Sequence, residues 1–332
     1  MIQRLSALGI LWLCWVATGC TAAQSLTADH APQQSGRHSL SLTVDGLERS
    51  IVLQLPKQYD GTDASGVRLW PLVVVLHGGG GSAKSTLWET GWADKAEQAG
   101  FIAVFPNAAA RNPQRRSSFA LNPQLWNDGS ERFYEGQAAV DDVRFLDALI
   151  TQLSRLYQVD PGRIYLTGFS NGASMSFLAA ARLPHRFAAI APVAGACWIE
   201  PGRLRPPVSM LYITGTDDPL NLIEGGAPRL ATGKADAVRS KPKPPVRESI
   251  LKWVRALGMP EQPYSVTRDD GVSTERYGQK NSAVEVRYVA VEGLGHTWAG
   301  GRSILPQFMV GATSDKINAT DLIWEFFQLH SR

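Results

Sequence analysis

The stretch RIYLTGFSNGASMSFLAAAR, residues 163–182, joins a strand pattern to a helix pattern through one serine set between glycines. Arg163–Thr167 predicts a strand, Asn171–Arg182 predicts a helix, and Gly168-Phe-Ser-Asn-Gly172 between them has the form G-x-S-x-G. A turn this tight strains the backbone of its apex, Ser170, and larger side chains two positions to either side would collide. The stretch therefore predicts a nucleophilic serine above the carboxyl end of a sheet, backed by a helix N-terminus that favours negative charge. A glycine-rich turn without chemistry is the alternative.

Strands and helices alternate on both sides of this stretch. The continuous apolar runs Leu72–Leu76 and Phe101–Phe105 are typical of parallel strands buried on both faces. Further strands are predicted at Phe187–Val193, Val208–Ile213 and Val284–Val291. Helices are predicted at Thr86–Ala99, Val140–Tyr157, Glu248–Leu257 and Ala319–Leu329, the last capped by Asn318. The alternation predicts an α/β fold: one doubly wound domain with a mostly parallel central sheet and helices on both faces.

An antiparallel hairpin is predicted at the start of this domain. Ser39–Val44 and Ser50–Leu55 alternate apolar and polar residues around a turn at Asp45-Gly46. No later insertion has the pattern of a large helical lid, so the sequence predicts an open cleft.

Residues 106–138 form a long segment without clear periodicity. A loop of this length that leaves the carboxyl end of a strand is typical of a pocket wall. Trp126 lies within it, and Trp298 lies further along the chain. Both are candidates to stack on an aromatic or sugar ring of a substrate, and ordinary packing beneath a loop is the alternative.

Composition excludes several classes of function. The chain has 332 residues, 44% of them hydrophobic, and a net charge of +3, as in ordinary soluble domains. The densest basic stretch, Lys241–Arg247, is rich in proline and predicts a solvated loop, so no nucleic-acid partner is expected. The six histidines are far apart and there is no Cys-x-x-Cys, so neither a metal nor another cofactor is expected.

Residues 1–20 predict a signal peptide. Met1–Arg4 is positively charged, and Leu5–Ala17 is uncharged, nearly all apolar and too short to span a bilayer comfortably. The small residues that follow end in Cys20, which resembles a bacterial lipoprotein signal in which that cysteine becomes the lipidated N-terminus. Ordinary cleavage after Ala23 is the alternative.

The predicted organisation is a signal peptide at 1–20, a polar tether at 21–38 and a catalytic domain at 39–332. The protein is expected to be exported, as an outer-membrane lipoprotein or as a secreted or periplasmic protein, with membrane contact only through the lipid anchor. Cys197 is then alone in the mature chain, so no internal disulfide can form.

The serine needs a base and an acid, because its hydroxyl is a weak nucleophile until a base removes the proton. In this architecture the acid and then the histidine follow the serine along the chain. Two histidines, His296 and His330, lie beyond the acid strand, and His330 is close to the chain end, where chains fray. His296 is therefore the candidate base. The acid should follow Val208–Ile213, where Asp217 and Asp218 both qualify.

Acyl transfer also needs donors for the oxyanion. The backbone N–H of Asn171, the residue after the serine, is one candidate. The second should come from the loop His77-Gly-Gly-Gly-Gly81, whose glycines let backbone amides approach a substrate closely. A phosphate cradle is the alternative for this loop, but it lacks the Gly-Lys-Ser/Thr ending of a P-loop. His77 itself is predicted to orient the loop rather than to act as a base.

With these segments in place, the chain resembles the exported polyhydroxybutyrate depolymerase and feruloyl esterase-like hydrolases of the α/β-hydrolase fold. The matching pieces, in family order over residues 72–301, are VVVLHGGGGSA, WND at 126–128, VDDVRFL at 140–146, GFSNGASM, GTDDP and GHTWAGG. The resemblance implies Ser170 as nucleophile, Asp218 as acid and His296 as base, with the amides of Asn171 and Gly79 as oxyanion donors.

The predicted function is that of an exported serine carboxylic-ester hydrolase that works through an acyl-enzyme. The resemblance implies feruloyl, acetyl or hydroxyalkanoate esters as substrates, either polymeric or linked to polysaccharide, although no pattern of a separate polymer-binding module is present. Two alternatives remain. One is a serine peptidase on the same fold, and the other is a non-catalytic binding protein, which would predict a broken triad.

Overall fold

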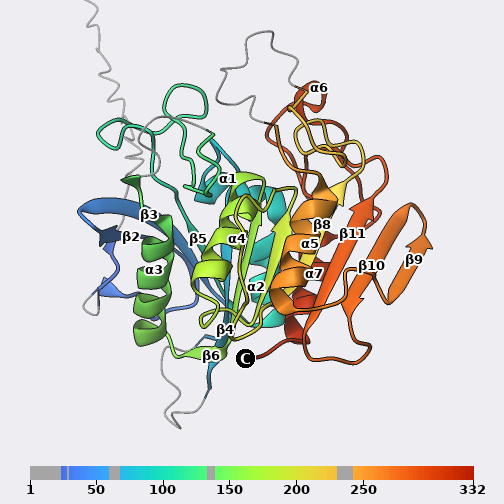
Figure 1. Cartoon of the computed structure of the whole chain (residues 1–332). Helices are drawn as coiled ribbons and strands as arrows, with labels where there is room; N and C mark the ends of the chain where they lie inside the picture. Colours follow the sequence, from blue (N-terminus) through green and yellow to red (C-terminus); the bar gives the residue numbers. More distant parts are fainter. Residues whose placement is uncertain (1–23, 28–29, 60–67, 133–138, 230–241) are drawn as a thin grey trace, which may run out of the picture.

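The structure is a computed structural model that describes residues 24–27, 30–59, 68–132, 139–229 and 242–332 (Figure 1). The predicted signal peptide and the predicted lipidation site, Cys20, lie outside these residues. The described chain forms an eleven-stranded sheet in the order β1-β2-β3-β5-β4-β6-β7-β8-β11-β10-β9, with helices on both faces.

Six neighbouring strands form the parallel centre of the sheet, and all five pairings between them are parallel. Nearly every side chain in them is buried, which explains their continuous apolar runs. In chain order they are β4 (Trp70–Leu76), β5 (Ile102–Pro106), β6 (Val159–Phe169), β7 (Ala189–Val193), β8 (Ser209–Gly215) and β11 (Glu285–Val291).

Antiparallel strands extend the sheet at both edges. The predicted N-terminal hairpin is confirmed as β2 (Gly36–Val44) and β3 (Leu47–Leu55), and β3 pairs with β5. A second hairpin, β9 (Ser265–Asp269) and β10 (Val272–Gly278), pairs with β11 at the other edge. Sequence analysis missed it because β9 is largely exposed and mostly polar, so it lacks an apolar pattern.

The N-terminal residues that the structure describes pack against the domain, unlike the tether expected over residues 21–38. Strand β1 (Gln24–Ser25) pairs with β2, and the N–H of Leu26 donates to the carbonyl of Ser41 at 2.7 Å. The Leu26 side chain is only 2% exposed. Burial of this apolar side chain removes apolar surface from water and so stabilises the packed position of the segment.

Helices cover both faces of the sheet. Alternate residues of β4 face opposite cores, since Leu72 and Val74 belong to one apolar cluster and Val73 and Val75 to the other. Helices α3 (Asp142–Leu156), α4 (Asn171–Arg182) and α5 (Val246–Leu257) pack on the first face, which is the near face in Figure 1. Helices α1 (Ala83–Thr90), α2 (Trp92–Ala99) and α7 (Ala319–Gln328) pack on the second.

The predicted helices are found with shifts of a few residues at their ends, and one of them is divided. The helix predicted over Thr86–Ala99 is two helices, because Gly91 between them has φ 69° and ends the first one. The predicted cap of the last helix is confirmed, since the Asn318 side chain accepts from the amide of Asp321 at 3.1 Å.

Loops gather at the carboxyl ends of the parallel strands, at the top of Figure 1. They include the segment after β5, the segment after β8, and the segment after β11 with the short helix α6 (Gln307–Val310). Among the helices of the described residues, none has the length and apolar character needed to cross a membrane.

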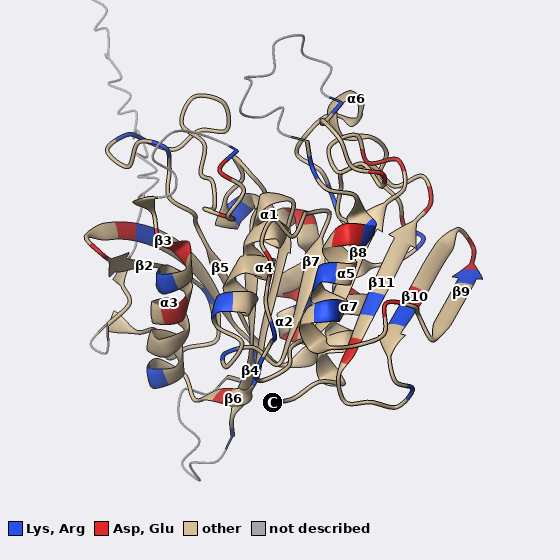
Figure 2. Ribbon diagram, viewed as in Figure 1, with Lys and Arg blue, Asp and Glu red and all other residues tan. Residues whose placement is uncertain are grey.

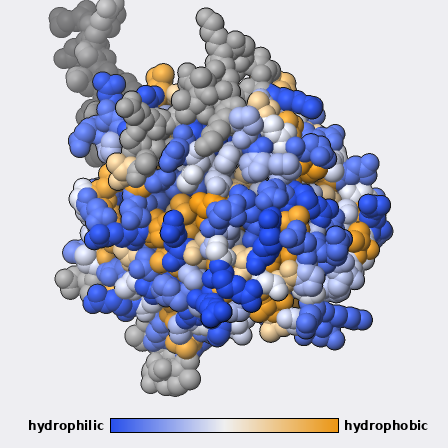
Figure 3. Space-filling view, viewed as in Figure 1, coloured by the Kyte–Doolittle hydropathy of each residue, from blue (hydrophilic) through white to orange (hydrophobic). Residues whose placement is uncertain are grey.

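Charges are mixed over the surface. Lys and Arg alternate with Asp and Glu along α3, whereas α5 carries mainly basic residues (Figure 2). On the face shown in Figure 3, hydrophilic residues predominate and hydrophobic ones are scattered among them.

Candidate active site

Ser170 lies at the apex of a tight turn between β6 and α4. Its backbone has φ 54° and ψ −113°, a region that residues other than glycine rarely adopt. Its N–H donates to the carbonyl of Val193 at 2.8 Å, which ties the turn to the next strand. A Cβ on Gly168 would lie 2.5 Å from the carbonyl carbon of Gly172, and one on Gly172 would lie 2.6 Å from the carbonyl oxygen of His77. Both glycines of the motif are therefore required by close backbone approach, as predicted.

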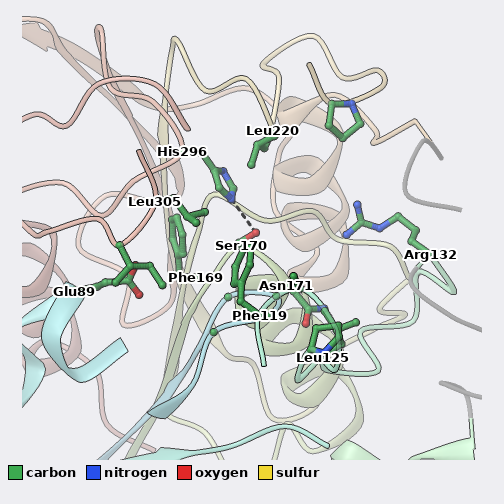
Figure 4. A pocket seen from close by; sticks show the side chains of 18 of the residues that line it. Glu89, Phe119, Leu125, Arg132, Phe169, Ser170, Asn171, Leu220, His296 and Leu305 are labelled. Atoms are coloured by element: carbon green, nitrogen blue, oxygen red, sulfur yellow. Dashed lines mark hydrogen bonds between the residues drawn. The ribbon is translucent and has the colours of Figure 1, made fainter. Parts of the chain in front are cut away.

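Ser170, His296 and Asp218 form a continuous hydrogen-bonded chain. Figure 4 shows the bond between Ser170 and His296. Ser170 Oγ lies 2.8 Å from His296 Nε2, and His296 Nδ1 lies 2.7 Å from Asp218 Oδ2. A carboxylate accepts from Nδ1–H, so Nε2 of the neutral ring carries a lone pair and can accept from the serine hydroxyl. This is the arrangement in which imidazole can remove the proton of a serine.

The order of strands in the sheet brings these three side chains together. β6, β7, β8 and β11 are successive neighbours, and Ser170, Asp218 and His296 follow β6, β8 and β11 at the same edge. The loop that carries His296 is packed closely, since a Cβ on Gly295 would lie 2.3 Å from the carbonyl oxygen of Val310.

Asp217 and Asp218 both qualified as the acid by their position after the strand, and the resemblance implied Asp218; the structure distinguishes the two. Asp218 is 2% exposed, and its Oδ1 accepts from the amides of Leu220 and Asn221, both at 2.7 Å. Burial acts to raise the pKa of Asp218, but the opposing effect of His296 prevails and holds that pKa below its usual value. Asp217 is exposed and accepts from the hydroxyl of Thr216 at 2.9 Å. Asp218 is thus the one that contacts His296.

The two predicted oxyanion donors lie on one cavity wall. Asn171 is the first residue of α4, and a Cβ placed on Gly79 would lie 3.6 Å from the Cβ of Asn171. The Asn171 side chain turns away to other partners, with Oδ1 accepting from the amide of Trp126 and Nδ2 donating to Asp128 Oδ2, each at 2.8 Å. It anchors the start of α4 and leaves the backbone amide of Asn171 as the group suited to the oxyanion.

His77 orients the glycine loop. Its Nδ1–H donates to the carbonyl of Gly78 at 2.7 Å, and its Nε2 accepts from the amide of Ala108 at 3.0 Å. Complete burial lowers the pKa of His77 to about 4. The ring is therefore neutral at pH 7 and links the glycine loop to the segment after β5, which matches the predicted orienting role.

Ser170 and His296 open into a cavity of about 340 Å³. Its apolar wall includes Phe119, Leu125 and Leu305 (Figure 4). Phe119 and Leu125 belong to the long segment after β5, so the prediction that residues 106–138 form a pocket wall is confirmed for the described part of that segment.

Comparison with known proteins identifies the family. The family model described as "Esterase PHB depolymerase" matches residues 58–238, more than half of the chain. The chain belongs to this family. The esterase NocK of Nocardia uniformis is 30% identical over 77% of this chain and 73% of its own length. Feruloyl esterase B of Piromyces equi is 28% identical over 76% of this chain and 44% of its own length, so the chain spans less than half of that relative.

Solved structures show the same fold as this esterase. The acetyl xylan esterase from Aspergillus awamori has a TM-score of 0.56 at 15% identity, covering 88% of this chain and 99% of that one. A thermostable esterase has a TM-score of 0.51 at 17% identity, covering 89% and 63%. The protein therefore has the α/β-hydrolase fold, and its family makes it a carboxylic ester hydrolase.

The two tryptophans predicted to stack on a substrate are buried in the esterase. Trp126 is 0% exposed and donates its ring N–H to the carbonyl of His77 at 3.0 Å. Trp298 is 2% exposed and donates to the hydroxyl of Thr320 at 3.0 Å. Neither ring offers an open face to a ligand, so the stacking hypothesis is wrong and the packing alternative holds for both.

Sequence analysis missed three charged residues on the cavity wall: Glu89, Arg132 and Lys243. Lys243 was placed in a solvated loop, but it is only 7% exposed, and burial together with the charge of Arg132 lowers its pKa to about 7. Burial raises the pKa of Glu89 to about 7. The prolines on either side of Lys243 did not indicate that this residue lies on the cavity wall. Its position there depends on contacts with segments far away in the chain.

The described residues contain no group of three or more His, Cys, Asp or Glu side chains placed to hold a metal ion. The Asn171 side chain links two of the motifs that the sequence shares with the family, GFSNGASM and WND. The WND motif contributes Trp126 and Asp128 to that network, roles that the bare sequence match did not reveal.

Proposed function

We propose that the esterase cleaves its substrates by acyl transfer to Ser170, with His296 as general base and acid and Asp218 as the group that orients His296. The observation that carries the proposal is the continuous hydrogen-bonded chain from Ser170 through His296 to Asp218 at the floor of an open cavity.

The first half of the reaction forms the acyl-enzyme. His296 Nε2 takes the proton of Ser170 as Oγ attacks the ester carbonyl, and Asp218 stabilises the imidazolium that forms. The amides of Asn171 and Gly79 donate to the oxyanion. His296 then gives its proton to the oxygen of the leaving alcohol, and the C–O bond of the ester breaks.

The second half releases the acid. A water molecule loses a proton to His296 and attacks the acyl carbonyl, and the oxyanion forms at the same two amides. Collapse of this intermediate returns the proton to Ser170 Oγ and frees the carboxylic acid.

Feruloyl, acetyl or hydroxyalkanoate esters are the proposed substrates, either polymeric or linked to polysaccharide. Support comes from the names of similar proteins, which include feruloyl esterase B, a bifunctional acetylxylan esterase/xylanase and poly(3-hydroxyalkanoate) depolymerase C. A cavity of about 340 Å³ with an apolar wall of Phe119, Leu125 and Leu305 fits a small acyl or aromatic group.

The nucleophile is tested by substitution and labelling. Ser170→Ala should lower turnover of a p-nitrophenyl ester by roughly four to six orders of magnitude while the circular dichroism spectrum stays unchanged. A serine-directed phosphonate should modify Ser170 alone, as read by peptide mass spectrometry. Retained activity, or labelling at another residue, would refute the assignment.

A serine peptidase is the competing activity, because the same three residues serve both reactions. Hydrolysis of p-nitrophenyl esters, methyl ferulate, acetylated xylan, hydroxybutyrate oligomers and peptide amides distinguishes the two. A higher kcat/KM for the peptide amides than for the esters would contradict the proposal that esters are the preferred substrates.

Export and lipid anchoring at Cys20 are part of the same proposal. They rest on the charged, apolar and small-residue segments of residues 1–20. An exported esterase could reach polymers or polysaccharides that do not enter a cell.

A further inference from the structure

Two buried cations line the cavity beside the reacting serine. Arg132 is 6% exposed and Lys243 is 7% exposed, and both line the cavity that contains Ser170 and His296. They come from distant parts of the chain, the end of the segment after β5 and the residues just before α5. In Figure 4, Arg132 and Glu89 lie on opposite sides of Ser170, so the cationic side of the cavity is distinct from the side where the carboxyl group lies.

The nearest carboxylates are already committed to other donors. Asp128 accepts from the amide of Ser130 at 3.0 Å and from Asn171 Nδ2 at 2.8 Å. Its Oδ2 lies 3.7 Å from Arg132 Nη2, which is an ion pair but longer than a normal hydrogen bond. Asp218 is held by His296 and by two backbone amides. Both acids therefore hold groups of the catalytic framework, and their charges also act on the two cations: Asp128 pairs with Arg132, and Asp128 and Asp218 both act to raise the pKa of Lys243.

Lys243 is held loosely for a buried amine. Its Nζ lies 3.4 Å from Asn221 Oδ1, near the upper limit for a hydrogen bond. Burying an amine and placing it near a second cation is unfavourable, which is why its pKa falls to about 7. An anion on this side of the cavity would offset both costs and would favour the charged form of the amine.

We propose that Arg132 and Lys243 form a carboxylate-binding subsite, so that the preferred substrates are small esters that also carry a free carboxylate. The inference rests on the proposed function and narrows its substrate class. A guanidinium group can hold a carboxylate through two parallel hydrogen bonds, and the amine adds a third donor. A hydroxyalkanoate dimer has this chemistry, because it contains one ester and one terminal carboxylate.

Matched substrate pairs test the subsite in the unaltered enzyme. On the alcohol side, the 3-hydroxybutyrate dimer is compared with its terminal primary amide. On the acyl side, monophenyl glutarate is compared with phenyl glutaramate, and the rate with Ser170→Ala protein is subtracted. In at least one pair kcat/KM should be about 10- to 100-fold higher for the carboxylate, as expected for hydrogen bonds to charged groups. Equal values within each pair would overturn the proposal.

Variants assign the preference to the two cations. Arg132→Gln and Lys243→Met should each reduce the ratio of kcat/KM between carboxylate and amide at least about 5-fold, and Lys243→Arg should retain most of it. The ratio is the readout because a general disturbance of the site affects both substrates alike. Arg144→Gln is the matched control, since Arg144 is an exposed cation paired with Asp45, and its ratio should equal that of the unaltered enzyme.

Failure of this inference differs from failure of the proposed function. If the subsite is wrong, the enzyme hydrolyses both members of a pair equally, or the ratio persists in Arg132→Gln and Lys243→Met. If the proposed function is wrong, Ser170→Ala leaves ester hydrolysis intact.

Discussion

Asp217 and Asp218 are neighbours in the chain, but the structure gives them opposite environments. The Asp218 side chain is buried against His296, and the Asp217 side chain is exposed to solvent. Asp218→Asn should lower turnover by about four orders of magnitude, because the imidazole loses the carboxylate that fixes its tautomer. Asp217→Asn should cost at most about tenfold. Steady-state kinetics of the two variants check this, and the opposite ranking would transfer the role to Asp217.

Glu89 should make folding stability depend on pH. Burial raises the pKa of this carboxyl from 4.5 to about 7, so between these values the folded chain keeps a proton that the unfolded chain releases. Stability from this group is therefore lost as pH rises from about 4.5 to about 7, and it changes no further above that range. Glu89→Gln mimics the protonated form and should remove this dependence.

Urea unfolding at a series of pH values measures the effect of Glu89→Gln. The variant should match the unaltered esterase near pH 4 and exceed it by about 1–3 kcal/mol near pH 8. A difference between the two proteins that stays constant across the series would count against burial as the cause.

At the scale of elements, His77 connects the glycine loop after β4 to the segment after β5. The structure needs its neutral ring, because Nε2 accepts from the amide of Ala108. Burial lowers the pKa of His77 from 6.5 to about 4. Between these pH values the imidazole of His77 binds a proton in the unfolded chain but stays neutral in the folded chain. Stability should therefore fall by up to about 3 kcal/mol as pH drops from 6.5 to 4.

The variant His77→Asn should flatten this acid slope while lowering stability at pH 7.5, since it removes the buried ring and its bond to Ala108. Chemical unfolding between pH 4 and 8 provides the comparison. The His77→Asn variant should also have a lower kcat with little change in KM, because the loop that carries Gly79 loses its fixed position. An acid slope equal to that of the unaltered protein would show that other groups cause it.

At the scale of the whole molecule, the predicted lipidation of Cys20 concerns the cellular location of the protein. If Cys20 is lipidated, Cys20→Ala should move the protein from the membrane fraction to the soluble fraction of cells, because a multiply acylated cysteine holds a protein firmly at a bilayer. Mass spectrometry of the mature N-terminus checks the modification directly. An unmodified terminus near Gln24 would favour ordinary secretion.

Much of the site could be predicted because its signals are local. Gly168, Ser170 and Gly172 specify the strained turn by themselves, since the glycines are needed wherever such a turn occurs. His296 followed from the order of elements along the chain, and the apolar runs marked the buried parallel strands. The loop His77–Gly81 carried its own signal, since a run of glycines brings backbone amides close to a ligand.

By itself, the sequence determined the class of fold, the position of the proposed nucleophile and the order of its proposed partners, because these depend on short patterns of residues. The resemblance implied Asp218 as the acid, but only the tertiary structure showed its contact with His296. It alone decided that Trp126 and Trp298 are buried and that Lys243 lines the cavity. The direction of a side chain and its exposure are set by segments far away in the chain. No local pattern contains that information, so packing between those segments had to supply it.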